Sequence, residues 1–153
     1  MASPSTLAAP LALKAVRAIL VADVTLSAML AAAPSALGGG PAIYSEQDVP
    51  QTGVLFPYVT LLGVSEIEWD TIGEVGSACQ VQVKALSTQP NTDEAAAIVS
   101  RAKVLLDRKT MSLSGYPSAF CRFESAFSPY TENVAGVAVK HYPATFRISA
   151  HKG

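Results

Sequence analysis

The most regular pattern in the chain is an alternation of apolar and polar residues over residues 79–85. The segment reads Cys79-Gln80-Val81-Gln82-Val83-Lys84-Ala85. A period of two places the apolar side chains on one face of a β-strand and the polar side chains on the other. The pattern therefore predicts a strand with one buried face and one wet face.

A second strand is predicted just before it, over about Tyr58 to Asp70. Aromatic and β-branched residues dominate its first half, and in its second half Ile67 and Trp69 alternate with acidic residues. Gly73 to Gly76 supply turn chemistry after it. The two segments predict an antiparallel hairpin with a projecting tip, one acidic face and one apolar face.

Two amphipathic helices are predicted, over about residues 7–32 and 92–108. The apolar stripe of the first is formed by Leu13, Val16, Leu20 and Val24, with Leu26 and Leu30 beyond them. The stripe of the second is formed by Ile98, Ala102, Leu105 and Leu106. Both helices should therefore pack an apolar side against the strands.

Further strands are predicted over Ala119 to Glu124 and over Val137 to about Ala150. Pro143 has no N–H for a ladder, which favours an edge position or a bulge in the last strand. Ile43-Tyr44 reads as a brief strand between loops at 33–42 and 45–53. Turn or loop is expected at 114–117, 128–129 and 133–136.

These segments predict the α+β class: a mainly antiparallel sheet with a long projecting hairpin, backed by two helices. A length of 153 residues fits one domain over residues 1–153. Residues 1–9 are expected to be flexible.

The Ala-rich first 40 residues have the composition of a secretory signal but not its layout. A signal needs roughly 7–15 continuous apolar residues behind a basic start. Here Lys14, Arg17 and Asp23 interrupt the stretch, and these charges would also be costly in a transmembrane helix. We expect a soluble helix, and Cys79 and Cys121 as free thiols in a reducing compartment.

Sequence motifs for catalysis are absent. The chain has no G-x-x-x-x-G-K-[ST], G-x-G-x-x-G, H-E-x-x-H or G-x-S-x-G motif. Its only histidines, His141 and His151, stand in no recognisable triad context. The row Glu66, Glu68 and Asp70 suits acid–base work, but a solvated strand face is the commoner explanation.

A zinc site is a weak alternative. Cys79, Cys121 and His141 offer three ligand types, but they lack the paired spacing of structural sites. Two buried strand residues and a half-exposed imidazole explain them more simply. We therefore expect no enzymatic activity, no cofactor and no metal.

Charge is distributed unevenly along the chain, although the formal net charge is only −1. Residues 23–83 contain no Lys or Arg and seven acids, namely Asp23, Glu46, Asp48, Glu66, Glu68, Asp70 and Glu74. From Lys84 onward the chain has nine bases and five acids. This separation suits head-to-tail contacts between identical copies, which can close into rings. The alternative is that folding mixes these charges in space.

In order and spacing, the segments resemble the tail-completion proteins of long-tailed bacteriophages, also called tail terminators or tail-to-head joining proteins. The resemblance covers about residues 10–150. It is carried by the opening helix, the strand start Phe56-Pro57-Tyr58-Val59, the return strand 79–85, the helix end Leu105-Leu106-Asp107 and the closing strand Tyr142-Pro143-Ala144-Thr145-Phe146-Arg147-Ile148.

The resemblance implies a structural protein of the virion, placed at the tail–neck junction and assembled in the host cytoplasm. It implies a homo-oligomeric ring, a hexamer, that caps the tail tube, ends tail polymerisation and offers a surface to a head–tail connector or neck protein. Double-stranded DNA would pass through the lumen without specific binding, since acidic walls disfavour phosphate contacts. No membrane partner is implied.

The hairpin supplies the candidate contact residues. Glu66, Glu68, Asp70 and Glu74 are expected to face the channel or a neighbouring subunit. Trp69 would be an interface anchor if it is exposed, and a core residue if it is buried.

Three other functions stay open. A neighbouring head–tail connector, either a neck adaptor or a stopper, shares the size and the assembly logic. A small cytosolic enzyme would need a site on the sheet, with His141 beside Cys121. A cytosolic ligand-binding domain would be a monomer or dimer and not a ring.

Overall fold

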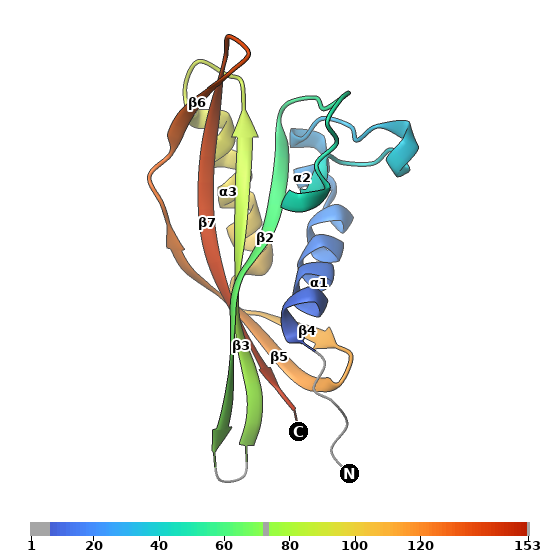
Figure 1. The fold of residues 1–153 in the computed structure, drawn as a ribbon, viewed down its shortest axis with the longest axis vertical. Helices are drawn as coiled ribbons and strands as arrows, with labels where there is room; N and C mark the ends of the chain where they lie inside the picture. Colours follow the sequence, from blue (N-terminus) through green and yellow to red (C-terminus); the bar gives the residue numbers. More distant parts are fainter. Residues whose placement is uncertain (1–6, 72–73, 153) are drawn as a thin grey trace.

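The computed structural model describes residues 7–71 and 74–152, without the side chains of Asp70, Thr71 and Glu74. Within them, one seven-stranded sheet packs against three α-helices (Figure 1), which confirms the α+β class. The helices are α1 (Ala8–Ala22), α2 (Val24–Met29) and α3 (Asp93–Leu106). The strands are β1 (Ile43–Ser45), β2 (Tyr58–Thr71), β3 (Glu74–Ser87), β4 (Lys109–Leu113), β5 (Tyr116–Ala126), β6 (Tyr130–Val134) and β7 (Val137–His151).

The long hairpin is formed by β2 and β3, as predicted. Its register runs from Tyr58 opposite Leu86 to Thr71 opposite Glu74, with a bulge between Gly63 and Ser65. In Figure 1 the hairpin extends past the other strands at the lower end of the molecule. Gly76, expected in the turn, instead lies inside β3, and Gly73 lies outside the described residues.

The last strand, β7, lies at the centre of the sheet, so the edge position predicted from Pro143 is wrong. The strand order is β1-β2-β3-β7-β5-β4, and β6 also pairs with β7. Pro143 stands opposite Lys84 on the β3 side. On its other side the chain passes from β5 to β6, and the carbonyl of Pro143 accepts the N–H of Phe127 at 3.0 Å. The missing N–H therefore falls where the neighbouring strand is interrupted.

Two short strands were not predicted. β4 follows α3 directly and pairs with β5, and β6 occupies part of the segment expected to be loop. β5 already begins at Tyr116, so the turn before it is shorter than expected. All five residues of β6 are exposed, so no apolar alternation marks it as a strand.

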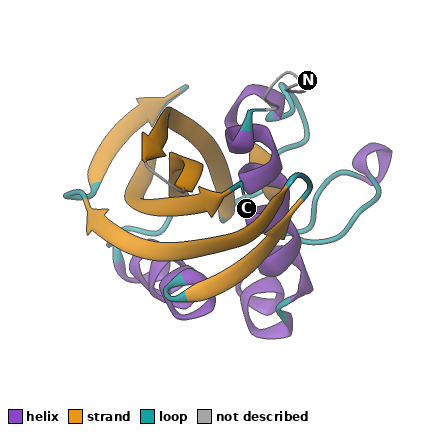
Figure 2. Cartoon of the chain, turned by 90° about the horizontal axis from the view of Figure 1, so that it is seen from below, coloured by secondary structure: helices purple, strands orange, loops and turns teal. Residues whose placement is uncertain are grey.

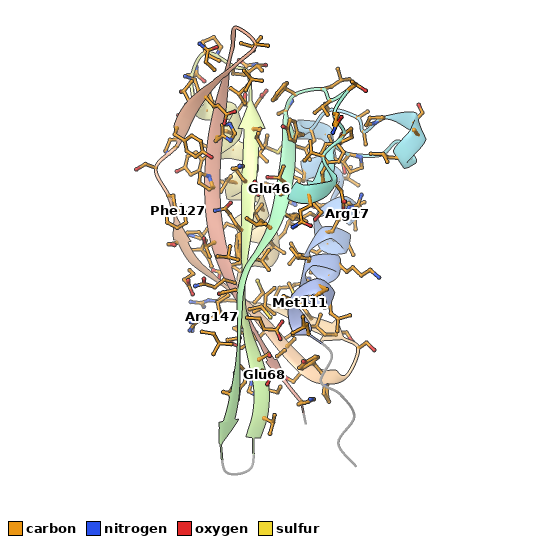
Figure 3. All side chains as sticks on the ribbon, in the orientation of Figure 1. Arg17, Glu46, Glu68, Met111, Phe127 and Arg147 are labelled. Carbon is orange, nitrogen blue, oxygen red and sulfur yellow. The ribbon has the colours of Figure 1, made fainter. Side chains whose placement is uncertain are left out.

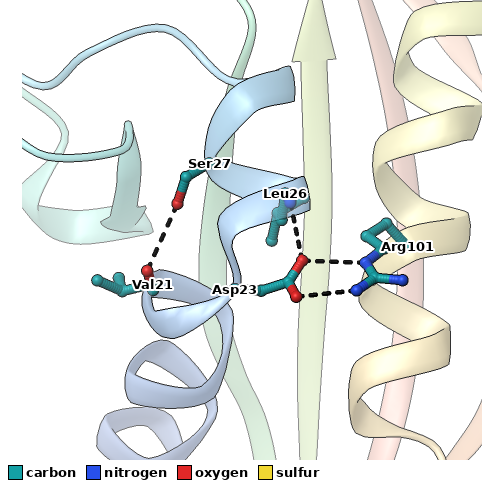
Figure 4. A network of polar contacts seen from close by, with 5 residues as sticks. All are labelled: Val21, Asp23, Leu26, Ser27 and Arg101. Atoms are coloured by element: carbon teal, nitrogen blue, oxygen red, sulfur yellow. Dashed lines mark hydrogen bonds and ion pairs between the residues drawn. The ribbon is translucent and has the colours of Figure 1, made fainter.

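The continuous helix predicted over residues 7–32 is wrong, because the chain breaks at Asp23. Asp23 has an extended backbone, and its carboxylate accepts the N–H of Leu26 at 2.8 Å, which caps α2. The same carboxylate accepts two bonds from the Arg101 guanidinium of α3, at 2.9 and 2.8 Å (Figure 4). Val24, expected in the apolar stripe, is therefore turned outward and 81% exposed.

The helices pack on one face of a curled sheet (Figures 1 and 2). α1 lies against β1, β2 and β3 and also touches β4, whereas α3 covers β3 and β7. The core between the layers includes Phe146 of β7, whose ring meets Phe123 edge-on at 5.7 Å. We call the side of the sheet away from α1 and α3 the open face. Among the described residues, no helix has the length and apolar character needed to cross a bilayer.

Candidate assembly surface

The lower half of the hairpin has two chemically different faces, as predicted. In the register, Glu66 and Glu68 stand opposite Cys79 and Ser77 and share their face, which is the helix face. Ile67 and Trp69 point to the open face by alternation. Asp70 and Glu74 lie in β2 and β3, but their side chains fall outside the described residues.

Glu66 is engaged within its own subunit. Its carboxylate accepts the N–H groups of Ala8 and Ala9 at 3.1 and 2.7 Å, and the hydroxyl of Ser77 at 3.0 Å. These backbone groups are the unpaired donors at the positive end of α1. Glu66 thus joins the start of α1 to the hairpin, a long-range cap that sequence spacing did not reveal.

We expect Glu66→Ala to lower the free energy of unfolding by about 1–3 kcal/mol, because it leaves the helix donors and Ser77 without their acceptor. Glu66→Gln keeps one acceptor oxygen and should cost less. Urea unfolding followed by circular dichroism measures both. An alanine variant as stable as the parent would contradict the capping role.

Glu68 and Trp69 differ in how much they are covered. Glu68 is exposed, and Figure 3 shows it low on the hairpin. Trp69 is half-buried on the open face, where its ring meets His151 of β7 edge-on at 5.3 Å. Trp69 is therefore neither a core residue nor a free anchor, while Glu68 is available to a partner.

The charge separation seen along the chain is partly lost in space. Asp23 pairs with Arg101 at 2.8 Å, and Glu46 of the acidic segment lies 3.7 Å from Lys84. Arg101 and Asp23 reinforce one another: their hydrogen bond lowers the pKa of Asp23 and raises the pKa of Arg101. The electrostatic case for head-to-tail contacts therefore rests on the hairpin and not on the whole segment.

The residues of the alternative zinc or enzyme site are not brought together. Cys79 and Cys121 lie on the helix face, on either side of Ile148, and His141 lies on the open face. Burial raises the pKa of Cys79 to about 11 and that of Cys121 to about 12. Both thiols therefore stay protonated and are poor nucleophiles. Among the described residues, no three His, Cys, Asp or Glu side chains gather as metal ligands.

A mostly apolar cavity of about 450 Å³ lies between α1 and β1. Lys14, Arg17 and Asp48 line it together with apolar side chains. Arg17 donates to the carbonyl of Ile43 at 3.3 Å. Neither histidine and neither cysteine lines this cavity.

A cluster of buried polar groups at the upper end of the open face was missed from the sequence. The imidazole of His141 is buried, not half-exposed as expected, and stacks on Tyr130 at 4.6 Å. Its Nε2 lies 3.5 Å from a Glu132 oxygen. Within the described structure, five buried side-chain atoms lack a hydrogen-bond partner, and they belong to Tyr44, Glu46, Thr60 and His141.

His141 should make stability depend on pH. Burial, followed by nearby Lys84, lowers the pKa of His141, against the opposing effects of Glu132 and Glu46. The unfolded chain binds this proton near pH 6.5, so it binds more protons than the fold as the pH falls below that value. The stability that the neutral His141 contributes is therefore fully present above about pH 6.5. It is lost progressively as the pH falls from there through the lower pKa of the folded state.

Thermal unfolding at a series of pH values tests this expectation. The melting temperature should decrease as the pH is lowered below about 6.5. The variant His141→Phe, which keeps a ring against Tyr130, should make the melting temperature less dependent on pH. An unchanged slope in that variant would assign the effect to another group, and His151→Phe is the matched control.

Comparison with known proteins identifies the class. The fold matches a chain of the virion of the native gene transfer agent (GTA) particle, with a TM-score of 0.70 and 19% sequence identity over 96% of this chain and 99% of that chain. At this identity the likeness is one of fold. Among curated proteins nothing matches.

The sequence model of the tail completion protein gp17 family matches residues 14–150. The chain belongs to this family. It is a structural protein of the phage tail or head–tail region, as the sequence resemblance implied.

Proposed function

We propose that this protein forms a ring at the tail–neck junction that caps the tail tube and stops its polymerisation. Copies of the chain, six by the resemblance, would assemble in the host cytoplasm and present one surface to the tube and another to a head–tail connector. The family match over residues 14–150 carries the proposal. The lumen of the ring would let DNA pass without specific contacts.

The site geometry supports a non-enzymatic role. The two thiols are buried and protonated, and His141 is separated from them by the sheet. The projecting hairpin carries an exposed carboxylate, that of Glu68, which is available to a partner. We propose Glu68, Trp69, Asp70 and Glu74 as residues that face the lumen or a neighbouring subunit. Glu66 caps α1 and is assigned to the fold.

Electron microscopy of particles made without this protein tests the terminator role. Loss of a terminator should give tails of uncontrolled length, because nothing stops the addition of tube subunits. Light scattering at several concentrations measures the ring mass, and charge reversal at Glu68, Asp70 and Glu74 should reduce it.

A head–tail connector, either a neck adaptor or a stopper, is the second candidate. The family match fits it as well, because tail completion does not by itself specify the partner. Loss of a connector should give tails of normal length that do not join heads. Binding of the purified protein to isolated tail tubes would favour the terminator.

A further inference from the structure

The open face of β5, β6 and the start of β7 carries large apolar side chains that the described part of the subunit leaves partly exposed. Phe120 stands opposite Ser149, and Tyr130 stands opposite His141, which places both rings on this face. The exposed members are Phe120, Phe127, Tyr130, Val134 and Val137, with exposures between 36% and 51%. So many exposed apolar side chains on one face of a small protein indicate a contact surface.

Two arginines lie within this surface. Arg122 of β5 and Arg147 of β7 stand directly opposite one another, an arrangement of like charges that destabilises a sheet. Arg147 has a partner, because Glu124 lies 3.3 Å from its Nε and is itself held by Gln80 at 2.6 Å. Arg122 is exposed and forms no ion pair with another described residue.

We call Phe120, Arg122, Phe127 and Tyr130 the β5–β6 strip. Figure 3 shows Phe127 and Arg147 on the same side of the molecule, the side away from α1. Aromatic residues and arginine are the residue types that dominate binding energy at protein interfaces. A strip in which aromatic rings share a face with an exposed guanidinium therefore fits a partner with an exposed carboxylate.

The hairpin of a second copy supplies such a carboxylate. Glu68 lies on the helix face of β2, whereas Arg122 lies on the open face of β5. Across the sheet Glu68 aligns with Ser77, Ala150 and Ala119, and Arg122 is three residues further along β5. The two groups thus lie on opposite faces, about 10 Å apart along the strand direction. A head-to-tail contact joins two such different patches of the same chain.

We propose that the β5–β6 strip of each copy receives the Glu68 side of the hairpin of the next copy, with Glu68 against Arg122. The proposal rests on the ring proposed above and names the contact that builds it. It assigns an acidic half of the interface to β2 and a basic, aromatic half to β5 and β6.

A charge exchange tests the contact. Arg122→Glu and Glu68→Lys should each weaken association at least about tenfold, because each places like charges together. The double variant restores an opposite pair and should recover assembly. Lys109→Glu makes the same charge change at an exposed position outside the strip and should leave the mass unchanged. Light scattering measures assembly, and circular dichroism checks that every variant is folded.

The outcomes separate the contact from the ring. A ring that persists in Arg122→Glu, or that the double variant does not restore, overturns the contact while the ring stands. If Arg122→Glu assembles normally but no longer completes particles, the strip faces a different protein and the proposal is wrong. A wild-type chain that is monomeric at all concentrations, and in isolated particles cross-links to no other copy, rejects the ring and the contact together.

Discussion

A Phe146→Ala variant is expected to lose about 3–5 kcal/mol of unfolding free energy. Phe146 is fully buried in the central strand β7, and its ring meets Phe123 edge-on at 5.7 Å. Truncation removes buried apolar area and leaves a cavity that the sheet and α3 cannot close, because both layers are held by their own hydrogen bonds. A loss of this size approaches the total stability of many domains, roughly 5–15 kcal/mol.

Chemical denaturation measures the loss, and Phe127→Ala is the matched control. Phe127 is 51% exposed, so its truncation should change monomer stability by less than about 0.5 kcal/mol. The same control variant should weaken assembly if the β5–β6 strip is an interface. A Phe146→Ala protein that keeps nearly all of its stability would contradict the central packing of β7.

The second large effect is expected at Gly76. A methyl group at this position would meet the carbonyl oxygen of Ala150 and the indole of Trp69. The backbone carbonyl belongs to the neighbouring strand and cannot move freely, so Gly76→Ala must shift either β7 or the tryptophan. We expect a loss of about 1–3 kcal/mol, the usual range for overpacking.

Gly63 of β2 provides the comparison within the same hairpin. A methyl group there would make ordinary contacts, 3.5 Å from Leu13 and 4.0 Å from Ala9. Gly63→Ala should therefore be neutral or stabilise the protein by about 0.4–1 kcal/mol, since alanine restricts the unfolded chain. Thermal unfolding of the two variants side by side gives the result, and equal effects would exclude the clash at Gly76.

The elements that could be predicted from the sequence are those with long, regular burial. The hairpin, α3 and β7 each show many apolar residues at one period. The predicted extents of β2, α3 and β7 agree closely with the structure, whereas β3 begins five residues earlier than predicted, at Glu74. β4 and β6 have five residues each, which is too short for a period to emerge. At the helix break Asp23 also binds Arg101, a residue 78 positions away, which no local pattern could indicate.

The candidate site was harder to predict from the sequence, because its contacts join residues that are far apart along the chain. The row of hairpin acids was predicted to share a face, but nothing local indicates that Glu66 binds the start of α1, 57 residues earlier. The ion pairs of Asp23 and Glu46 depend likewise on tertiary proximity. The β5–β6 strip likewise can be recognised only when the strand register shows which side chains of β5, β6 and β7 share a face.

The central position of β7 has a consequence for biosynthesis. Its neighbours β3 and β5 both precede it along the chain and do not pair with one another. During translation these strands emerge with exposed edges and can join only after the last strand of the sheet has left the ribosome. A subunit truncated before β7 would lack the strand that joins the two parts of the sheet and would leave the edges of β3 and β5 unpaired, so we expect it not to fold.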